Sequence, residues 1–271
     1  MKKYVYPVLS NRDWSFFRVG GPGLANCMFI AAHAYVLALR NGCELLRPTW
    51  ERFGIGQWIR KESDKRLYTG LFVGGGLAQS MRKLLLRTFR RSDISFVRWD
   101  LSFFRGLWGY EEPIKAYFKS IICPSAVVMV PDNLHQSIAV HVRLGDFPAH
   151  YRTPISWYKS MVEQISSCAE KMGLEILVFS DGTNSELEPL LKIPGVRRAF
   201  FGNALADLIA ISRCRFLIGS DSTFSTWAAF LGSVPCVFAH LNDCPPFANN
   251  DSYAVLGEDD NIPMSLMEYL S

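Results

Sequence analysis

The segment 138–147, which reads IAVHVRLGDF, constrains the fold of this chain more than any other feature. Its apolar run ends abruptly in Arg143 and Asp146, and Gly145 between them lets the chain turn. This pattern is typical of a buried strand whose carboxyl end carries polar side chains into a crevice, where open α/β sheets bind ligands. A guanidinium there can bind a phosphate through two parallel hydrogen bonds. We therefore expect an α/β sheet with an anionic, nucleotide-like ligand at its edge.

Composition indicates a folded chain with a large core. Of the 271 residues, 49% are hydrophobic and 13% are aromatic, which argues against disorder. The length suits one large domain or two small ones that share a cleft. The net charge of +4 suits an anionic substrate or a membrane surface. Because the sequence has no RNA-binding or zinc-finger signature, we expect no nucleic-acid partner.

Cysteine and histidine spacing argues against a metal site. The seven cysteines are scattered and never spaced as CxxC, and the five histidines lack metal-ligand spacing. We expect reduced thiols in a cytoplasmic protein and no metal cofactor. The N-terminus starts with basic residues but lacks the long apolar core of a signal peptide. No apolar stretch reaches the roughly 18 residues of a membrane span, so membrane contact is expected only peripherally, at the inner face.

Strands and helices alternate clearly in the second half of the sequence. Strands are predicted over 137–143, 174–180, 196–201, 215–220 and, as the final strand, 234–239. Helices are predicted over 156–172, 204–213 and 223–231. This alternation predicts a parallel, doubly wound sheet.

The first half is harder to assign. A short strand at 16–19, a glycine turn and a helix over 24–40 that is closed by Gly42 precede a strand at 43–47. Helices are expected between residues 50 and 118. We place the boundary between the halves near Pro131, which gives an N-terminal domain of residues 1–130 and a C-terminal domain of residues 131–271.

A second segment, 216–229, passes from a buried strand into a helix through a cluster of hydroxyl groups. The free amides of a first helical turn and the helix dipole favour an anion, and Ser222, Thr223 and Ser225 add donors. The simpler interpretation is a helix cap, because Ser, Thr and Asp are preferred there. With Arg143 at another strand end of the same sheet, anion binding becomes the favoured interpretation.

These segments resemble the motifs of one enzyme family. The heptapeptide HVRLGDF at 141–147 is similar to the HxRxGD(Y/F) motif of the α-1,2-fucosyltransferases, glycosyltransferase family 11. Residues 211–232 resemble its C-terminal signature of a helix, a strand, S(S/T)FSWW and a helix, and GGPGLANCMF at 20–29 resembles its GGLGNQMF opening. The chain departs from the family pattern at Ala25, Cys27, Leu144 and Thr226.

The resemblance implies a GT-B-like fold of two Rossmann-like halves facing a cleft, with the acceptor on the N-terminal side. It implies that the C-terminal half holds GDP-fucose, with Arg143 at the diphosphate. The loop that binds the phosphates would comprise Ser222, Thr223, Phe224 and Ser225.

Four further residues carry roles by resemblance. Asn26 matches the asparagine of the family's GNQ sequence and would face the cleft beside the donor. Asp207 occupies the place from which related fucosyltransferases bind guanine through a carboxylate. His141 would approach the base or the ribose. Asp181 ends the sequence Phe179-Ser180-Asp181, which matches an FSDD-like segment of the family. A simpler structural interpretation explains three of these residues about equally well. Asp207 would be a helix-start residue, His141 a strand-end histidine with its hydrogen bonds made inside the protein, and Asp181 part of a turn-forming Asp-Gly pair.

The donor defines the chemistry to expect. When the sugar C1–O bond breaks through an oxocarbenium-like state, negative charge grows on the β-phosphate. Arg143 and helix amides can stabilise that charge without a metal, as the resemblance also implies. Inversion would need a base for the acceptor hydroxyl. Asp146 is the nearest candidate in the sequence, although an ion pair with Arg143 explains it equally well.

The leading hypothesis is transfer of L-fucose from GDP-fucose to a hydroxyl, galactose O2 by resemblance, of a glycan or lipid-linked glycan. The setting would be bacterial surface-polysaccharide assembly. The alternatives are another GDP-sugar as donor and a non-catalytic relative that binds a glycan or nucleotide. A dinucleotide oxidoreductase is disfavoured, because residues 21–26 lack the third glycine of GxGxxG. The basic segment 82–91 reads as a peripheral membrane helix or, as we favour, an ordinary solvated helix face.

Overall fold

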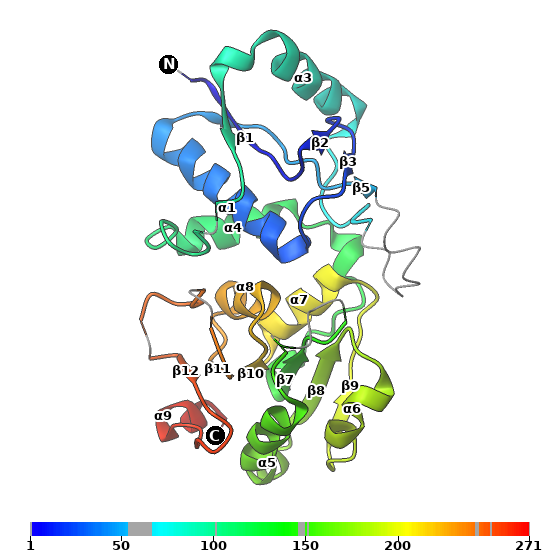
Figure 1. The fold of residues 1–271 in the computed structure, drawn as a ribbon, viewed down its shortest axis with the longest axis vertical. Coiled ribbons are helices and arrows are strands. Elements are labelled where there is room, and N and C mark those ends of the chain that lie inside the picture. The colour runs from blue at the N-terminus through cyan, green and yellow to red at the C-terminus, as the bar shows by residue number, and fades with distance from the viewer. Residues whose placement is uncertain are drawn as a thin grey trace. The chain divides into compact units, whose positions relative to one another are not determined.

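The computed structural model describes residues 2–53, 67–100, 102–145, 150, 152–241, 244–249 and 251–270. The chain divides into two compact units, Met1–Val128 and Met129–Ser271 (Figure 1). Both units combine parallel strands with helices, so the predicted α/β class is confirmed. The sequence placed the boundary after residue 130, and the contacts within the chain place it after Val128.

The C-terminal unit is a six-stranded sheet in which every neighbouring pair is parallel. Its strands lie in the order β12-β11-β10-β7-β8-β9. The chain therefore starts in the middle of the sheet, moves outward through β8 and β9, and returns to the other side of β7 with β10. This is the 3-2-1-4-5-6 order of doubly wound sheets, with the reversal between β7 and β10. The strands are β7 (Ser137–Val142), β8 (Glu175–Ser180), β9 (Val196–Arg198), β10 (Phe216–Gly219), β11 (Cys236–Phe238) and β12 (Tyr253–Val255).

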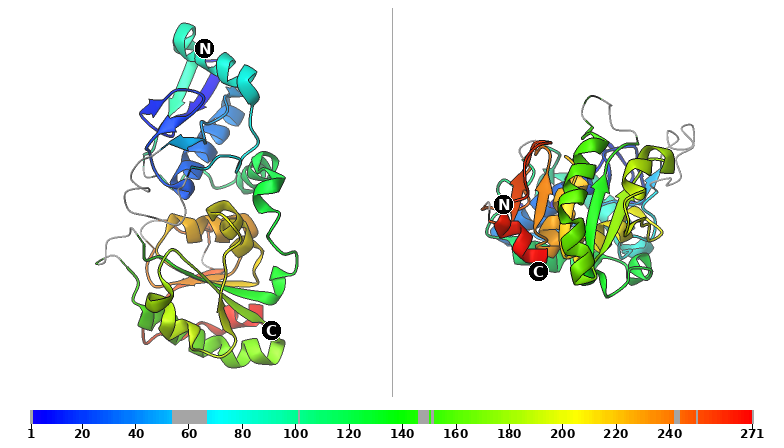
Figure 2. Two further views of the ribbon diagram at one scale, coloured as in Figure 1. Left: turned by 90° about the vertical axis from the view of Figure 1, so that its right-hand side faces the viewer. Right: turned by 90° about the horizontal axis from the view of Figure 1, so that it is seen from below.

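Helices cover both faces of this sheet (Figure 2). One face carries α5 (Ile155–Met172), α6 (Asn184–Leu191) and α9 (Met264–Met267), and the other carries α7 (Ala204–Arg213) and α8 (Thr223–Gly232). Side chains alternate along β7, which is buried throughout. Ile138, Val140 and Val142 pack toward α5, and His141 therefore points to the face of α7 and α8.

The N-terminal unit is built around a smaller parallel sheet in the order β4-β1-β6. A second small sheet has the order β2-β3-β5, and only its β2–β3 pair is antiparallel. Side chains of α1 pack on β1 through Val5, Ala34 and Ala38. The strands are β1 (Tyr4–Pro7), β2 (Arg12–Asp13), β3 (Arg18–Val19), β4 (Glu44–Leu45), β5 (Arg52–Phe53) and β6 (Ile94–Val97), and the helices are α1 (Leu24–Asn41), α3 (Gly76–Phe89) and α4 (Glu111–Ile121).

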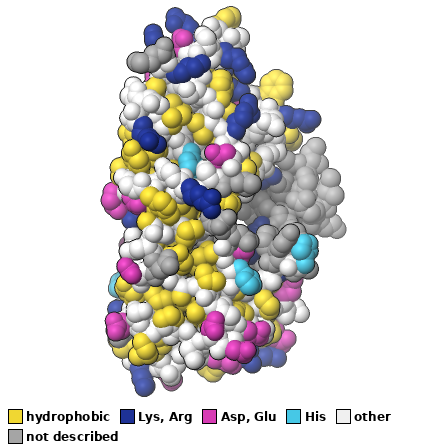
Figure 3. All heavy atoms as spheres, turned by 60° about the vertical axis from the view of Figure 1, so that its left-hand side comes forward, with side chains coloured by type: hydrophobic (Ala, Val, Ile, Leu, Met, Phe, Trp, Pro, Cys, Tyr) yellow, Lys and Arg dark blue, Asp and Glu magenta, His cyan; other side chains and the backbone are white. Residues whose placement is uncertain are grey.

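Charge is divided unevenly between the units. Residues 1–128 contain 20 Lys and Arg against 9 Asp and Glu, whereas residues 129–271 contain 9 Lys and Arg against 16 Asp and Glu. On the face drawn in Figure 3, most of the dark blue Lys and Arg side chains lie on the N-terminal unit. None of the helices that the structure describes combines the length and apolar composition of a membrane span.

Most predicted elements are present, with some corrections. Helix α7 has its predicted bounds, and Gly42 ends α1 in the left-handed conformation as expected. The strand predicted as final is followed by β12, so that prediction was wrong. The prediction also missed β1, β6 and the short helix α6, which contains Pro189.

One close approach tests the packing of α7 on α8. A Cβ added at Gly232 would lie 1.8 Å from the carbonyl oxygen of Ser212 in α7. Because that atom belongs to the backbone, the two helices must separate to admit a methyl group. We expect Gly232→Ala to lower the free energy of unfolding by about 1–3 kcal/mol in urea titrations. Gly74→Ala is the control, because its Cβ meets nothing within 4 Å. Equal midpoints for both variants would contradict this packing.

Candidate functional site

The ends of β7 and β10 form the centre of the candidate site. These strands pair in parallel, with Ile138 opposite Phe216 and Val140 opposite Ile218. Their carboxyl ends therefore meet at one edge of the sheet, at the point where the strand order reverses. Doubly wound sheets bind ligands in the crevice that opens there. The loop after β7 brings Arg143 to this edge, and the loop after β10 leads into α8.

Asp181, at the end of β8, holds the loop after β7 in place. Its Oδ2 accepts a hydrogen bond from Arg143 Nη1 at 2.5 Å. Its Oδ1 accepts from the backbone amides of Leu144 at 2.8 Å and Gly145 at 3.1 Å. A Cβ at Gly145 would lie 2.5 Å from Asp181 Oδ2, so a side chain at this position would displace the carboxylate. The carboxylate thus fixes both the guanidinium and the backbone of the loop.

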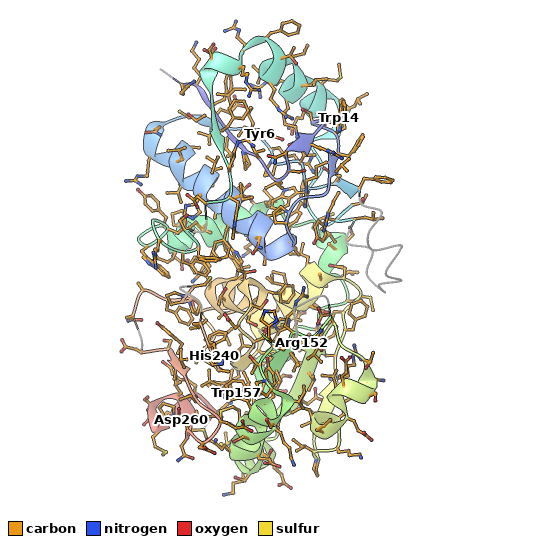
Figure 4. The ribbon with its side chains drawn as sticks, viewed as in Figure 1. Tyr6, Trp14, Arg152, Trp157, His240 and Asp260 are labelled. Carbon is orange, nitrogen blue, oxygen red and sulfur yellow. The ribbon has the colours of Figure 1, made fainter. Side chains whose placement is uncertain are left out.

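Arg152 strengthens the same loop from its far side. This residue, labelled in Figure 4, donates from Nη2 to the carbonyl oxygen of Gly145 at 3.1 Å. The loop after β7 is therefore held by a carboxylate at its amides and by a second guanidinium at its carbonyl. The sequence analysis did not single out Arg152, since a cation just before a helix carries no distinctive signal.

Buried hydroxyl groups connect β7 to the start of α8. Nδ1 of His141 lies 2.6 Å from Oγ of Ser225 and 3.0 Å from Oγ of Ser220. The two hydroxyls lie 3.1 Å apart, and the histidine ring stacks on Phe224 with centroids separated by 4.9 Å. All three hydrogen-bonding side chains are buried. The hydroxyl of Ser225 therefore makes hydrogen bonds inside the protein, and these bonds position the first turn of α8. Ser220 is a site residue that the sequence analysis did not name.

His141 is held in its neutral form. Its pKa is lowered to about 4, chiefly by burial; the charge of Asp181 opposes this shift, and the charge of Arg143 adds to it. A neutral ring can either donate or accept at Nδ1, which suits two hydroxyl partners. His141 is thus a strand-end histidine whose Nδ1 has hydrogen-bond partners inside the protein, which is the simpler interpretation of the sequence.

Ser222 is the N-cap of α8. Its Oγ accepts from the amide of Phe224 at 3.2 Å, and its carbonyl accepts from the amide of Thr226 at 3.1 Å. The helix starts at Thr223, so its first-turn amides lie at the same edge as Arg143. Such amides and the helix dipole favour an anion. Capping and anion binding are compatible here, because the cap occupies one amide of the turn.

The remaining predicted residues are Asp207, Asn26 and Asp146. Asp207 is in the first turn of α7, and its Oδ1 accepts from the amide of Phe201 at 2.7 Å. Asn26 is in the first turn of α1, in the N-terminal unit. Asp146 lies outside the described residues. Within the described part of the chain, no three His, Cys, Asp or Glu side chains gather into a potential metal site.

Two buried hydroxyls, Thr153 Oγ1 and Tyr158 Oη, lie near this edge, and the hydroxyl of Tyr158 lies close to both Thr153 and Ser220. Burial raises the pKa of Tyr158, so its hydroxyl stays protonated. Sequence reasoning missed both, because a tyrosine in the first turn of an apolar helix is ordinarily a core residue.

Residues 122–250 match the model of Glycosyl transferase family 11. The chain carries a glycosyltransferase family 11 domain. This domain contains β7 to β11 with the loops of Arg143 and Ser222, so the candidate site lies within it. The resemblance noted in the sequence is confirmed for this glycosyltransferase domain. No curated protein matches the sequence.

Several solved structures are similar to the chain. The α-1,6-fucosyltransferase NodZ co-crystallised with GDP has 16% identity and a TM-score of 0.46, covering 87% of this chain and 93% of that one. A variant of Arabidopsis thaliana FUT1 in complex with GDP has 16% identity and a TM-score of 0.46, with coverages of 90% and 72%. A family 9 glycosyl transferase from Veillonella parvula has 12% identity and a TM-score of 0.44, with coverages of 98% and 90%.

The buried histidine should make stability depend on pH. The unfolded chain protonates His141 near pH 6.5, whereas the folded chain does so only near pH 4. The unfolded state therefore binds more protons between these values, and acidification destabilises the fold. We expect wild type to lose about 1–3 kcal/mol more than His141→Gln between pH 7 and pH 4.5 in urea titrations. The exposed His135→Gln is the control, and parallel curves for wild type and His141→Gln would contradict the assignment.

The loop contacts of Asp181 give a second prediction. Asp181→Ala removes the acceptor of the Leu144 and Gly145 amides, whereas Asp181→Asn keeps a side-chain oxygen in place. We expect the alanine variant to lose about 1 kcal/mol in the free energy of unfolding, since the part-buried Leu144 amide is left without its partner. The asparagine variant should lose less. If the two variants are equally stable, the carboxylate does not hold the loop.

Proposed function

We propose that this glycosyltransferase transfers L-fucose from GDP-fucose to a hydroxyl group of a glycan acceptor, with inversion at the anomeric carbon. The observation that carries the proposal is the meeting of Arg143 and the N-terminus of α8 at the switch point of a family 11 domain. A guanidinium and a helix N-terminus together suit a diphosphate. Galactose O2 is proposed as the acceptor atom on the resemblance to α-1,2-fucosyltransferases.

The arrangement accounts for the chemical step. When the C1–O bond breaks, negative charge grows on the β-phosphate of the leaving GDP. Arg143 and the first-turn amides of α8 would stabilise that charge, and we propose that no metal ion is needed for it. A guanidinium has five N–H donors, so the bond to Asp181 is compatible with a pair of bonds to phosphate oxygens. Asp181 acts here as a positioning residue, because it holds Arg143 in place before the donor arrives.

The other predicted residues have proposed roles around the donor. Asp207 would accept hydrogen bonds from N1–H and N2–H of guanine, and the Phe201 amide orients its carboxylate. His141 would act through the ring of Phe224 and the hydroxyl of Ser225. Asn26 would contact the donor from the N-terminal unit. Asp146 remains the candidate base, since it comes three residues after Arg143 in the chain.

The cellular role is also a proposal. We propose that the acceptor is a glycan or lipid-linked glycan in bacterial surface-polysaccharide assembly, and that the enzyme works in the cytoplasm. Another GDP-sugar as donor would leave the guanine and diphosphate contacts unchanged. The direct test of the donor is therefore a comparison of GDP-fucose with other GDP-sugars.

The experiment measures GDP-fucose turnover in the presence of EDTA, with mixed galactosides as acceptors or hydrolysis as the readout. Wild type should turn over, and Arg143→Ala should lose about 10²–10³-fold in rate, the usual effect of removing one donor to the developing charge. Arg197→Ala is the matched control, because Arg197 is exposed on β9 and pairs with Glu175. An active Arg143→Ala variant would refute the site. Turnover of a different GDP-sugar alone would refute the donor, and GDP binding without any turnover would indicate a non-catalytic relative.

A further inference from the structure

Helix α3 has the reverse of the usual polarity of a surface helix. The residues that it buries fully are Ser80 and Lys83, both polar, and its one apolar contact with the core cluster of Tyr6 is the partly buried Leu86. Its outward residues include Leu77, which is 74% exposed, and Phe89, which is 77% exposed. Met81, Leu84 and Leu85 are exposed between them. Spacings of three and four residues place all five on one side of the helix.

Polar contacts inside the N-terminal unit hold the helix in this rotation. Nζ of Lys83 donates to Thr49 Oγ1 at 2.8 Å and to the carbonyl of Arg47 at 3.3 Å. Arg87, one turn later, donates from Nη1 to Asp13 Oδ1 at 3.0 Å and to Ser15 Oγ at 2.9 Å. These contacts turn the polar side of α3 inward, so the apolar side is held toward solvent.

The interior side is itself an organised cluster around Tyr6. This residue of β1, labelled in Figure 4, faces α3. Its hydroxyl hydrogen-bonds with Asp13 and Thr49, and the guanidinium of Arg87 lies 4.8 Å from the centre of its ring. Burial lowers the pKa of Lys83 to about 8, with neighbouring charges acting in both directions. Rotating α3 to bury its leucines would break this cluster and expose Asp13, so the outward apolar face is a stable feature of the fold.

The apolar face is continuous along α3. Leu39 on α1 and Met172 on α5 are exposed singly near helix ends, which is ordinary for a protein surface. Five large apolar side chains along one helix form a contiguous patch, and such patches mark contact with a protein or a membrane. The outer face of α3 is defined here as Leu77, Met81, Leu84, Leu85 and Phe89.

Three arginines, Arg82, Arg90 and Arg91, accompany this face along the chain. Residues 76–93 contain five Lys and Arg and one Asp, and of these cations Lys83 and Arg87 are bound on the inward side. Arg82 is half-exposed and pairs with Glu44, Arg90 is exposed and lies 3.5 Å from Asp93, and Arg91 lies over the ring of Phe96. An apolar helix face with a basic rim fits an interface that is apolar inside and anionic at its surface.

We propose that the outer face of α3 docks on the surface of a bilayer that contains anionic lipids. The five apolar side chains enter the boundary between headgroups and acyl chains, and Arg82, Arg90 and Arg91 contact the headgroup phosphates. The helix lies in the plane of the bilayer. This takes up the peripheral membrane helix, which the sequence offered as the alternative to an ordinary solvated helix face. The proposal is independent of the donor and the acceptor, because it concerns binding in the absence of substrate.

The test is co-sedimentation of the full chain with vesicles. Wild type should bind vesicles of phosphatidylglycerol and phosphatidylcholine, and binding should weaken as NaCl is raised. The double variant Leu85→Gln and Phe89→Gln should reduce the partition constant by about tenfold or more, since both side chains leave the acyl boundary. Both positions are exposed, so the fold is retained, as thermal unfolding would show. Leu39→Gln is the matched control on α1 and should bind as wild type does.

A second set of variants tests the contribution of charge and distinguishes docking on a bilayer from docking on a second copy of the chain. Arg90→Gln with Arg91→Gln should weaken binding to the anionic vesicles, whereas Lys119→Gln on α4 should not. Wild type should bind phosphatidylcholine vesicles far more weakly. The proposal is overturned if the Leu85 and Phe89 variant binds vesicles as well as wild type does. It is also overturned if wild type ignores the vesicles and sedimentation velocity shows a dimer that this variant abolishes, since the face would then be an interface between copies.

Discussion

The reversal of strand order between β7 and β10 is the constraint on which the rest of the C-terminal unit depends. The strands on the two sides of β7 are connected by helices that lie on opposite faces of the sheet. Among the described elements, no connecting helix therefore crosses the carboxyl edge of the sheet at β7 and β10. The two loops that face each other there come from distant parts of the sequence. Arg143 and the start of α8 share a site only because β7 and β10 pair in register.

The polar groups of the site form two sets, one buried in the interior and one at the edge of the sheet. His141, Ser220 and Ser225 are buried and satisfy one another, and they tie the end of β7 to the first turn of α8. Asp181 ties the end of β8 to the loop of Arg143. The groups left at the edge are thereby fixed before any ligand binds. Preorganised donors of this kind stabilise developing charge without the cost of rearrangement.

The sequence predicted what depends on periodicity and chain order. Helix α7 and the parallel sheet follow from apolar alternation, and Arg143 follows from its place after a buried strand. It missed β1 because Tyr4–Pro7 follows basic residues and is only four residues long, and it missed α6 because Pro189 interrupts the helical pattern. The burial of Ser225 could not be predicted, because which hydroxyl of a helix start turns inward depends on how α8 packs against β7. The polarity of α3 was missed because its interior partners, Asp13 and Thr49, come from far earlier in the chain.

The central claim is that the edge between β7 and β10 binds the diphosphate of a nucleotide sugar. Hydrogen–deuterium exchange of the intact chain, with and without GDP, tests it most directly, since it reports protection of individual backbone segments. The account predicts that GDP slows exchange in the loop 143–145 and at the start of α8, residues 222–225, and that GMP, which lacks the second phosphate, slows it much less. Protection by GDP confined to other segments, or equal protection by GDP and GMP, would contradict the claim.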